Sequence, residues 1–278
     1  MNASPPSSKQ TALYPEISGF QVLEPVGKGA MSVVYMGRRT SDGLTVAVKV
    51  METRRLEQGT LLERFILEQD ILAGIDNPHV VKTYGHGFND DYAFLVMEFF
   101  ENGDLDHYME RGISERSALI CLKQIALALD VVHAAGVVHR DIKPHNVMLR
   151  GNSTVALTDF GVAKLMRQDL NLTKRNECFG SPAYMSPEQI RGDKLDGRSD
   201  LYSLGVVLFE MLAGRKPYIA KTPKAVFDLH INAPPPELPP DRARYQPLIN
   251  RLMAKDRARR YVTAGELLAD LPQYRSQK

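Results

Sequence analysis

The chain has 278 residues, of which 44% are hydrophobic and 24% charged, and this balance is typical of a folded globular protein with a sizeable core. Its 35 basic and 33 acidic residues give a net charge of +2, which argues against a nucleic-acid-binding protein. The two cysteines, Cys121 and Cys178, have no Cys or His neighbours at metal-ligand spacing, so neither a zinc site nor a disulfide framework is expected.

The N-terminus and the most apolar segment argue against two further classes. The opening stretch, MNASPPSSKQ, lacks the apolar core of a secretory signal. The longest apolar run, residues 201–212, is too short to span a bilayer and contains Glu210. We therefore expect a cytoplasmic protein, or the cytosolic part of a longer one that a membrane anchors.

The first hundred residues predict mainly strands. Residues 1–15 are polar and are expected to form a flexible tail. One helix is expected at about 59–74. The expected strands are β-branched or aromatic runs between turn residues, at 20–26, 33–39, 44–51 and 92–99.

After Gly103 the pattern changes to helices. Gly136 is the expected end of a helix whose apolar residues recur at helical spacing, namely Leu119, Leu122, Ile125, Ala126, Leu129 and Val132. Similar stripes predict helices at about 198–214, 244–255 and 263–271. Residues 233–240, APPPELPP, are expected to be a rigid irregular connector rather than a peptide ligand. The sequence thus predicts a small β-rich lobe followed by a larger helical one.

Gly27 and Gly29 lie in a turn between two predicted strands. Glycine lets backbone amides approach a phosphate closely, although a plain hairpin turn explains the same pair. The segment is not a P-loop, because no Gly-Lys-Ser/Thr follows and a strand comes next.

A lysine and a glutamate stand out in apolar surroundings. Lys49 lies in the strand VAVKV, where alternation alone would place it on a solvated face. Glu68 interrupts an otherwise apolar helix stripe of Leu61, Phe65, Leu72 and Ile75. Because a buried unpaired carboxylate is costly, Glu68 needs a cation. Arg64, one helical turn away, is the local choice, and Lys49 is the favoured one.

The stretch VVHRDIKPHNVML, residues 137–149, puts polar groups between two apolar runs. Asp141 and Asn146 in this stretch, with Asp159 after the apolar run 155–157, supply the oxygen ligands that hard divalent cations take. Lys143 is a nearby cation suited to a phosphoryl group. These groups either satisfy one another in the interior or converge on a charged ligand.

Together, the motifs resemble those of the eukaryotic-like protein kinases, most closely the bacterial serine/threonine members. The resemblance covers about residues 20–272 and rests on Gly27-x-Gly29, Val46-Ala47-Val48-Lys49, Glu68, His139-Arg140-Asp141-x-Lys143-Pro144-x-Asn146, Asp159-Phe160-Gly161 and Ser186-Pro187-Glu188. It implies an α+β bilobal protein-kinase fold at 16–274, with an N-lobe of about 16–100 and a C-lobe of about 104–274. Ser32 for a third glycine and Ser186 for the usual Ala are small-for-small departures.

The resemblance assigns the chemistry. Asp141 would orient the substrate hydroxyl and accept its proton, Lys143 would neutralise the γ-phosphate, and Lys49 would hold the α- and β-phosphates. Asn146 and Asp159 would bind Mg²⁺, with Mn²⁺ as the alternative. The implied ATP-binding residues are Val26, Gly27, Lys28, Gly29, Ala30, Ser32, Val34, Ala47, Lys49, Glu68, Met97, Glu98, Phe99, Phe100, Asp104 and Met148.

Other residues would have structural or regulatory roles. His139 would pack with Phe160 and Leu72, Asp200 would anchor the catalytic loop, and Glu188 would pair with Arg260. Ser181 would lie beside Asp141 and Lys143. Arg140 and Lys164 would bind a phosphate on Thr173, in the activation segment 159–188. The alternative for Thr173 is an exposed loop hydroxyl without a regulatory role.

The implied function is transfer of the γ-phosphate of ATP to Ser or Thr of proteins, including autophosphorylation of the activation segment, with dimerisation as a route to autophosphorylation in trans. Protein substrates and the chain itself are the expected partners, without nucleic acid or membrane. A pseudokinase would lack Lys49, Asp141 or Asp159, and all three are present. A small-molecule kinase would lack the long segment that ends in Ser186-Pro187-Glu188.

Overall fold

The structure divides into two compact units. A computed structural model describes residues 14–29, 32–52, 59–89, 91–151, 154–160 and 182–274, with the backbone alone for 59–65. The sheet unit comprises the described residues up to 52 together with 84–99, and the helical unit comprises 59–83 and 100–274. The boundary differs from the expected N-lobe of 16–100, because the helix at 59–73 belongs to the helical unit by its contacts.

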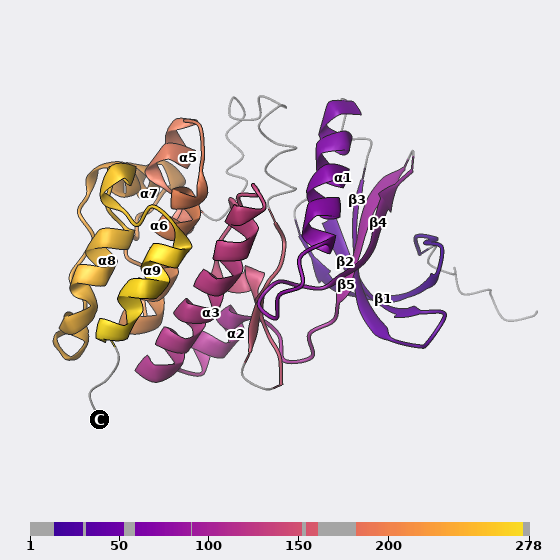
Figure 1. Cartoon of the computed structure of the whole chain (residues 1–278), viewed down its shortest axis with the longest axis horizontal. Coiled ribbons are helices and arrows are strands. Elements are labelled where there is room, and N and C mark those ends of the chain that lie inside the picture. Colours follow the sequence, from indigo (N-terminus) through magenta and orange to yellow (C-terminus); the bar gives the residue numbers. More distant parts are fainter. Residues whose placement is uncertain are drawn as a thin grey trace, which may run out of the picture. The chain divides into compact units, whose positions relative to one another are not determined.

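The sheet unit is built on five strands (Figure 1). Their order in the sheet is β1 (Phe20–Lys28), β2 (Ser32–Arg39), β3 (Thr45–Glu52), β5 (Tyr92–Glu98) and β4 (Thr83–Phe88). The four predicted strands are confirmed. The strand β4 was not predicted, since TYGHGF carries two glycines in place of a β-branched run.

The two faces of this sheet differ. Val46, Val48 and Val96 point to one face and form a core with Ile17. Val34 and Leu95 lie opposite Lys49 in the antiparallel ladders, and Met36 and Met97 lie opposite Ala47. Directly paired residues share a face, and residues two apart on a strand share it too, so these six side chains lie together on the other face. Alternation therefore turns Lys49 away from the valine core.

The helical unit contains α1 and seven further described α-helices. Their bounds are α1 Gly59–Ala73, α2 Leu105–Glu110, α3 Glu115–Ala134, α5 Pro187–Arg191, α6 Gly197–Ala213, α7 Pro223–Asn232, α8 Gln246–Leu252 and α9 Ala264–Asp270. A short hairpin joins β6 (Val147–Leu149) to β7 (Val155–Leu157). The helix α3 packs against α6, α9 and β7, and α6 also packs against α8 (Figure 1).

Two central helices show why these residues become helical. The predicted stripe of α3 is buried except for the half-buried Leu119, and Gly136 adopts a φ of 79° just beyond the helix end, as predicted. The helix α6 is buried on almost all sides, which is typical of a core helix. Among the described helices, only α3 has the length and apolar content that a bilayer crossing needs, and a buried core helix has both as well.

Three short helices, α2, α5 and α7, were not predicted. Each begins at a side chain that accepts a backbone N–H, namely Asp104, Ser186 and Thr222. Pro247 lies in the first turn of α8, which starts later than predicted because residues 240–245 form a 3₁₀ turn. Residues 234–239 are irregular, as expected.

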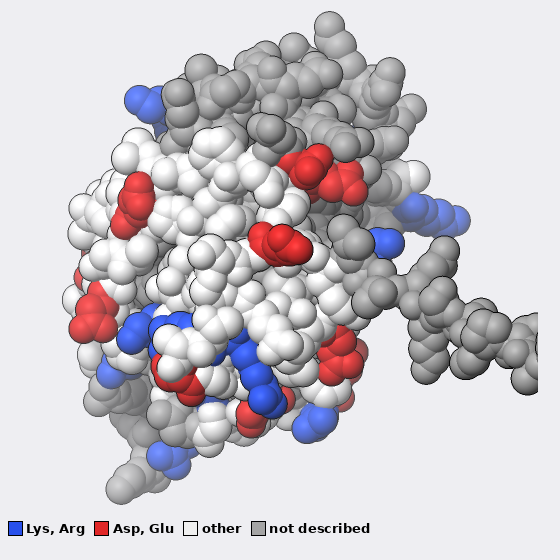
Figure 2. Space-filling view, turned by 90° about the vertical axis from the view of Figure 1, so that its right-hand side faces the viewer, with Lys and Arg blue, Asp and Glu red and all other residues white. Residues whose placement is uncertain are grey.

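Charge is dispersed on the face of the molecule in Figure 2. Basic and acidic side chains are interspersed there among uncharged residues, and the described part of that face shows no large patch of a single sign. Among the described residues, Arg39 and Asp42 form an exposed pair of opposite charges with two hydrogen bonds.

Candidate active site

One buried carboxylate holds the backbone of the segment 137–149. Asp200, only 1% exposed, accepts hydrogen bonds from the amides of His139 and Arg140, each at 2.8 Å. His133, in the last turn of α3, donates a third from Nε2, also at 2.8 Å. Burial would raise the pKa of Asp200, but the hydrogen bonds that it accepts from the His133 ring and from the His139 amide hold that pKa below its usual value. Asp200 therefore stays ionised and fixes the start of this loop.

His139 is a neutral core residue that orients its neighbours. Burial lowers its pKa. Its Nδ1 accepts the amide of Asp141 at 3.3 Å, so Nε2 carries the proton and donates to the carbonyl of Thr158 at 2.9 Å. Its ring lies 4.6 Å from that of Phe160, centroid to centroid. His139 thus ties the segment of Asp141 to the segment of Asp159.

A carboxylate, an ammonium and an amide meet at Asp141. The Nζ of Lys143 lies 2.8 Å from Asp141 Oδ2. The Nδ2 of Asn146 donates to the Asp141 carbonyl at 2.8 Å and to Oδ2 at 3.2 Å. The side chains of Asp141 and Lys143 are 24% and 20% exposed, so a substrate can reach them. This arrangement can orient a hydroxyl next to a positive charge.

The β6–β7 hairpin brings Asn146 and Asp159 to one end. The Thr158 amide donates to the Asn146 carbonyl at 3.0 Å, which puts Asp159 one residue from the pairing point. The described residues contain no cluster of three or more His, Cys, Asp or Glu side chains placed to bind a metal. A hard cation held by Asn146 and Asp159 would need further oxygen ligands, which a bound phosphate supplies. The donor set therefore fits a phosphate-bound Mg²⁺.

Two residues beside these groups have strained backbones. Arg140 has a φ of 67° and Asp159 a φ of 61°, the left-handed region that residues other than glycine rarely adopt. Such conformations persist only where the surroundings hold them, and they gather at functional sites. The segments that carry Asp141 and Asp159 are therefore held in conformations that the isolated chain would avoid.

In the sheet unit, the turn between β1 and β2 is closed by Gly29, whose amide donates to the Ser32 carbonyl at 2.8 Å. A Cβ atom added at Gly27 would meet only the Cβ of Val34, at the ordinary contact distance of 3.8 Å. The fold therefore leaves room for a side chain at Gly27. Glycine there suits a ligand that approaches the backbone.

The remaining predicted ATP-binding residues of the sheet unit differ in exposure. Val26 is 50% exposed and Lys28 is also exposed, whereas Ala47 and Met97 are buried. The strand β5 ends at Glu98, which pairs with Val46, and Phe99 follows outside the ladder. Val34, Ala47 and Met97 share the face of Lys49 and give it an apolar lining suited to an aromatic base.

The predicted ATP-binding residues of the helical unit lie on three segments. Asp104 caps α2, accepting the His107 amide at 2.9 Å, and its backbone pairs with that of Met148. Phe100 lies beneath the Arg150 guanidinium, 5.5 Å from the ring centre. Glu68 Oε1 lies 4.0 Å from Arg140 Nη2. This contact gives Arg140 an acidic neighbour. The expected pairing of Lys49 with Glu68 stays a prediction.

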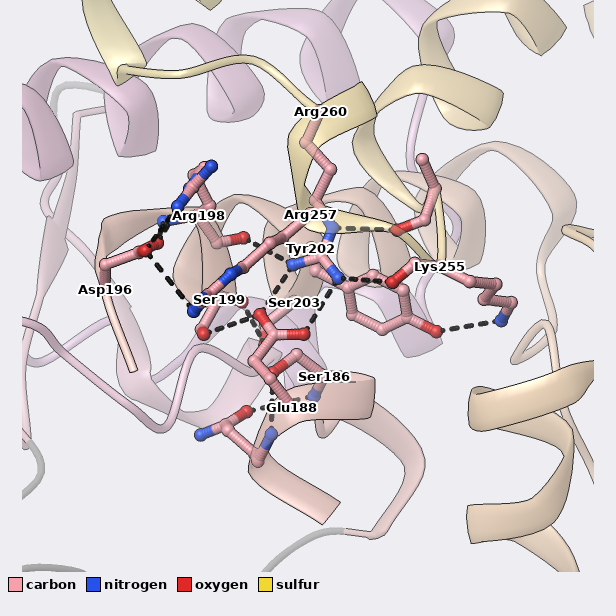
Figure 3. A network of polar contacts seen from close by, with 12 residues as sticks. Ser186, Glu188, Asp196, Arg198, Ser199, Tyr202, Ser203, Lys255, Arg257 and Arg260 are labelled. Carbon is pink, nitrogen blue, oxygen red and sulfur yellow. Dashed lines mark hydrogen bonds and ion pairs between the residues drawn. The ribbon is translucent and has the colours of Figure 1, made fainter. Parts of the chain in front are cut away.

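Glu188 and Arg260 form a buried ion pair in the helical unit (Figure 3). Arg260 donates to Glu188 Oε1 at 2.6 Å and to Oε2 at 2.8 Å, and the Ser199 hydroxyl donates to Oε1 at 2.6 Å. Burial would raise the pKa of Glu188, but Arg260 and Ser199 outweigh it and hold that pKa below its usual value. This pair fixes α5, and with it the Ser186-Pro187-Glu188 segment.

Four predicted residues, Ala30, Lys164, Thr173 and Ser181, lie outside the described residues. Conversely, the motifs did not reveal His133 or Gln189. His133 could have been found by extending the α3 stripe four residues beyond Leu129. Gln189 could have been found from its spacing three residues after Ser186, which is that of a capping box.

Comparison with known proteins agrees with this geometry. The family model described as "Protein kinase domain" matches residues 20–270. The chain is 39% identical over 263 residues to the serine/threonine-protein kinase pkn2 of Myxococcus xanthus, covering 89% of this chain and 31% of that protein. It is 36% identical over 250 residues to PknA of Corynebacterium glutamicum, covering 87% and 53%. It is 33% identical over 262 residues to PrkC of Bacillus subtilis, covering 92% and 40%. The chain thus spans about a third to a half of these relatives.

A solved structure supports the fold. The kinase domain of Mycobacterium tuberculosis PknI superposes with a TM-score of 0.74 at 24% identity, covering 92% of this chain and 95% of that one. The predicted α+β bilobal protein-kinase fold is confirmed, with an antiparallel sheet in one unit and mainly helices in the other. The resemblance seen in the motifs is confirmed as well, and the chain belongs to the protein kinase domain family.

Proposed function

We propose that the chain is an ATP-dependent serine/threonine protein kinase. The observation that carries the proposal is the cluster of Asp141, Lys143 and Asn146, in which a partly exposed carboxylate lies 2.8 Å from an ammonium. The names of the relatives, all serine/threonine kinases, support the same activity and the same class of substrate.

Each group of the cluster has a chemical role in this proposal. Asp141 orients the substrate hydroxyl and accepts its proton, while Lys143 neutralises charge on the transferred phosphoryl group. Asn146 keeps Asp141 in place through its Nδ2, which leaves its Oδ1 as the ligand that a cation takes. His139 and Asp200 hold the backbone on which Asp141 depends.

We further propose that ATP and a divalent cation bind beside this cluster. Bound Mg²⁺ would neutralise phosphate charge, and Asn146 and Asp159 would hold it, with Mn²⁺ as the alternative. Lys49 would bind the α- and β-phosphates, and the backbone at Gly27 and Gly29 would lie against them. The apolar face of Val34, Ala47 and Met97 would receive the adenine, and Asp104 the ribose.

Two other functions are less well supported. A pseudokinase would bind nucleotide without transfer, yet Lys49, Asp141 and Asp159 are all present. A small-molecule kinase needs no peptide platform, whereas here the Ser186-Pro187-Glu188 segment is fixed by the buried pair of Glu188 and Arg260. That segment favours a protein substrate.

The test is phosphotransfer from labelled ATP to a generic protein substrate, with Mg²⁺ and with Mn²⁺, followed by mass spectrometry of the product. We expect phosphoserine or phosphothreonine on the substrate and on the chain. The variants Lys49→Met and Asp141→Asn should each abolish phosphotransfer while staying folded by circular dichroism, since loss of a general base such as Asp141 alone costs about 10²–10⁴ in rate. Wild-type rates in Asp141→Asn would contradict the assignment, and nucleotide binding without transfer by the parent would favour a pseudokinase.

The partners and location of the chain follow from this proposal. Protein substrates and a second copy of the chain, for autophosphorylation in trans, are the partners we propose. ATP as co-substrate suits the cytoplasm, or the cytosolic side of a longer kinase with a membrane anchor. Cross-linking of the chain during autophosphorylation, with a dilution series of the initial rate, would test the dimer.

A further inference from the structure

Gln189, in the short helix α5, makes two different hydrogen bonds with its two amide atoms. Its Oε1 accepts the backbone amide of Ser186 at 3.0 Å, and the Ser186 hydroxyl accepts the Gln189 amide at 3.3 Å. These two bonds form the capping box of α5. Its Nε2 points elsewhere and donates to the backbone carbonyl of Arg140 at 2.8 Å. Capping α5 requires only the oxygen of this side chain.

The Arg140 residue is therefore held from both sides. Asp200 accepts its amide at 2.8 Å, and Gln189 donates to its carbonyl. Between those bonds lies a backbone with a φ of 67°, which an arginine rarely adopts. The carbonyl that Gln189 holds belongs to the peptide bond that leads directly into Asp141. A rotation of that peptide would move the Asp141 carboxylate.

We propose that Gln189 is a positioning residue for catalysis, which holds the Arg140–Asp141 peptide in place through its amide nitrogen. The inference rests on the proposed role of Asp141. It adds a function for a side chain that the sequence motifs leave unassigned, and it links the fixed segment 186–188 to the catalytic loop. The hydrogen bond from Gln189 to the Arg140 carbonyl lies within the protein and does not involve the nucleotide. Its loss should therefore affect the rate of transfer more than the binding of nucleotide.

Two substitutions at this position separate the roles of the two amide atoms. Gln189→Glu keeps the oxygen that caps α5, since glutamate is equally suited to a capping box, but its carboxylate cannot donate to the Arg140 carbonyl. Gln189→Met loses both the donor and the capping oxygen without adding charge. A rate loss shared by both variants therefore reports the lost donor. A loss confined to Gln189→Met reports the cap, and a loss confined to Gln189→Glu reports the charge.

Gln246 offers a matched control in the same unit. Its Oε1 accepts the Leu238 amide at 2.8 Å, and its Nε2 donates to the Pro236 carbonyl at 3.1 Å. Gln246→Glu likewise replaces a donating amide by a carboxylate, with loss of the bond to the Pro236 carbonyl and of a second one to Asn250 Oδ1 at 2.9 Å. Among the hydrogen bonds of the described residues, this site has no contact with the segment 137–149. It shows the effect of such a change on stability alone.

The experiment measures kcat and the KM for ATP of the whole chain, with thermal midpoints by circular dichroism. We expect kcat to fall about 10- to 100-fold in Gln189→Glu and Gln189→Met, with the KM for ATP within about twofold of the parent. Gln246→Glu should keep kcat within about twofold.

Asp141→Asn is measured in parallel to separate this inference from the proposed function. If Asp141→Asn is inactive while both Gln189 variants match the parent, the positioning role is wrong and the proposed function stands. If Asp141→Asn is as active as the parent, the assignment of Asp141 is wrong, whatever the Gln189 variants do. Equal rate losses in Gln189→Glu and Gln246→Glu would also overturn the positioning role.

Discussion

Arg260→Met should destabilise the protein strongly, because it leaves a buried carboxylate without its cation. The side chains of Arg260 and Glu188 are 0% and 6% exposed. Arg260 makes two hydrogen bonds to Glu188 and donates to the carbonyls of Ala254, Arg198 and Lys255. Removal of one partner of a buried ion pair typically costs about 3–5 kcal/mol. Total stabilities are about 5–15 kcal/mol, so the expected loss is a large fraction.

Circular dichroism is the suitable assay, since the chain contains no tryptophan for fluorescence. For a protein of this size, each kcal/mol lowers the thermal midpoint by about 2–4 °C, so Arg260→Met should lower it by about 10 °C. Arg39→Met removes an exposed partner of a similarly bidentate pair and is the control, and its effect should be much smaller. Glu188→Met combined with Arg260→Met should cost far less than the sum of the single changes, because the double variant leaves no uncompensated charge.

The pH dependence provides a second check on the same pair. The pKa of Glu188 lies below its usual value, so the stability from its ionised form is present above the unfolded pKa, about 4.3, and is lost as the pH falls through the lower folded value. The advantage of the parent over the double variant should shrink in that acidic window. In Arg260→Met, burial without the cation should raise the pKa of Glu188, so this variant should recover part of its deficit as the pH falls from neutral. Additive costs in the double variant, or a loss below about 1 kcal/mol in Arg260→Met, would refute the reasoning.

Two further predictions concern groups that the structure describes only in part. Glu68→Ala should lower kcat while ATP-binding stoichiometry stays at the parent value, since Glu68 is expected to position Lys49. A larger effect of Arg64→Ala in the same assay would show that Glu68 pairs with Arg64 on its own helix instead. Thr173→Ala should lower activity on an added substrate, and mass spectrometry of the autophosphorylated chain should find phosphate at Thr173, because a phosphate there would bind Arg140 and Lys164. An unmodified Thr173 together with full activity of the alanine variant would exclude the switch.

The sequence alone determined the features that depend on local order. The apolar spacing of 119–132 predicts α3, and Gly136 marks its end, because a helix requires only that residues three and four apart share a face. The β-branched run at 44–51 likewise predicts β3, and alternation along it predicts that Lys49 points to the opposite face from its neighbours Val48 and Val50. The family resemblance, which rests on short motifs in a fixed order, implied the pairing of Glu188 with Arg260 and the role of Asp200.

Only the tertiary structure decided which distant backbone groups the side chains of Asp200 and Gln189 reach. Asp200 lies 60 residues from the Arg140 amide that it accepts, and Gln189 lies 49 residues from the Arg140 carbonyl. A residue type shows that a donor or acceptor exists but not which distant group it meets. Spacing therefore could not show that His133 reaches Asp200, that Gln189 reaches the Arg140 carbonyl or that Glu68 contacts Arg140. The strand β4 was missed for a related reason: its glycine-rich residues are extended because β5 pairs with them, and not because of their own preference.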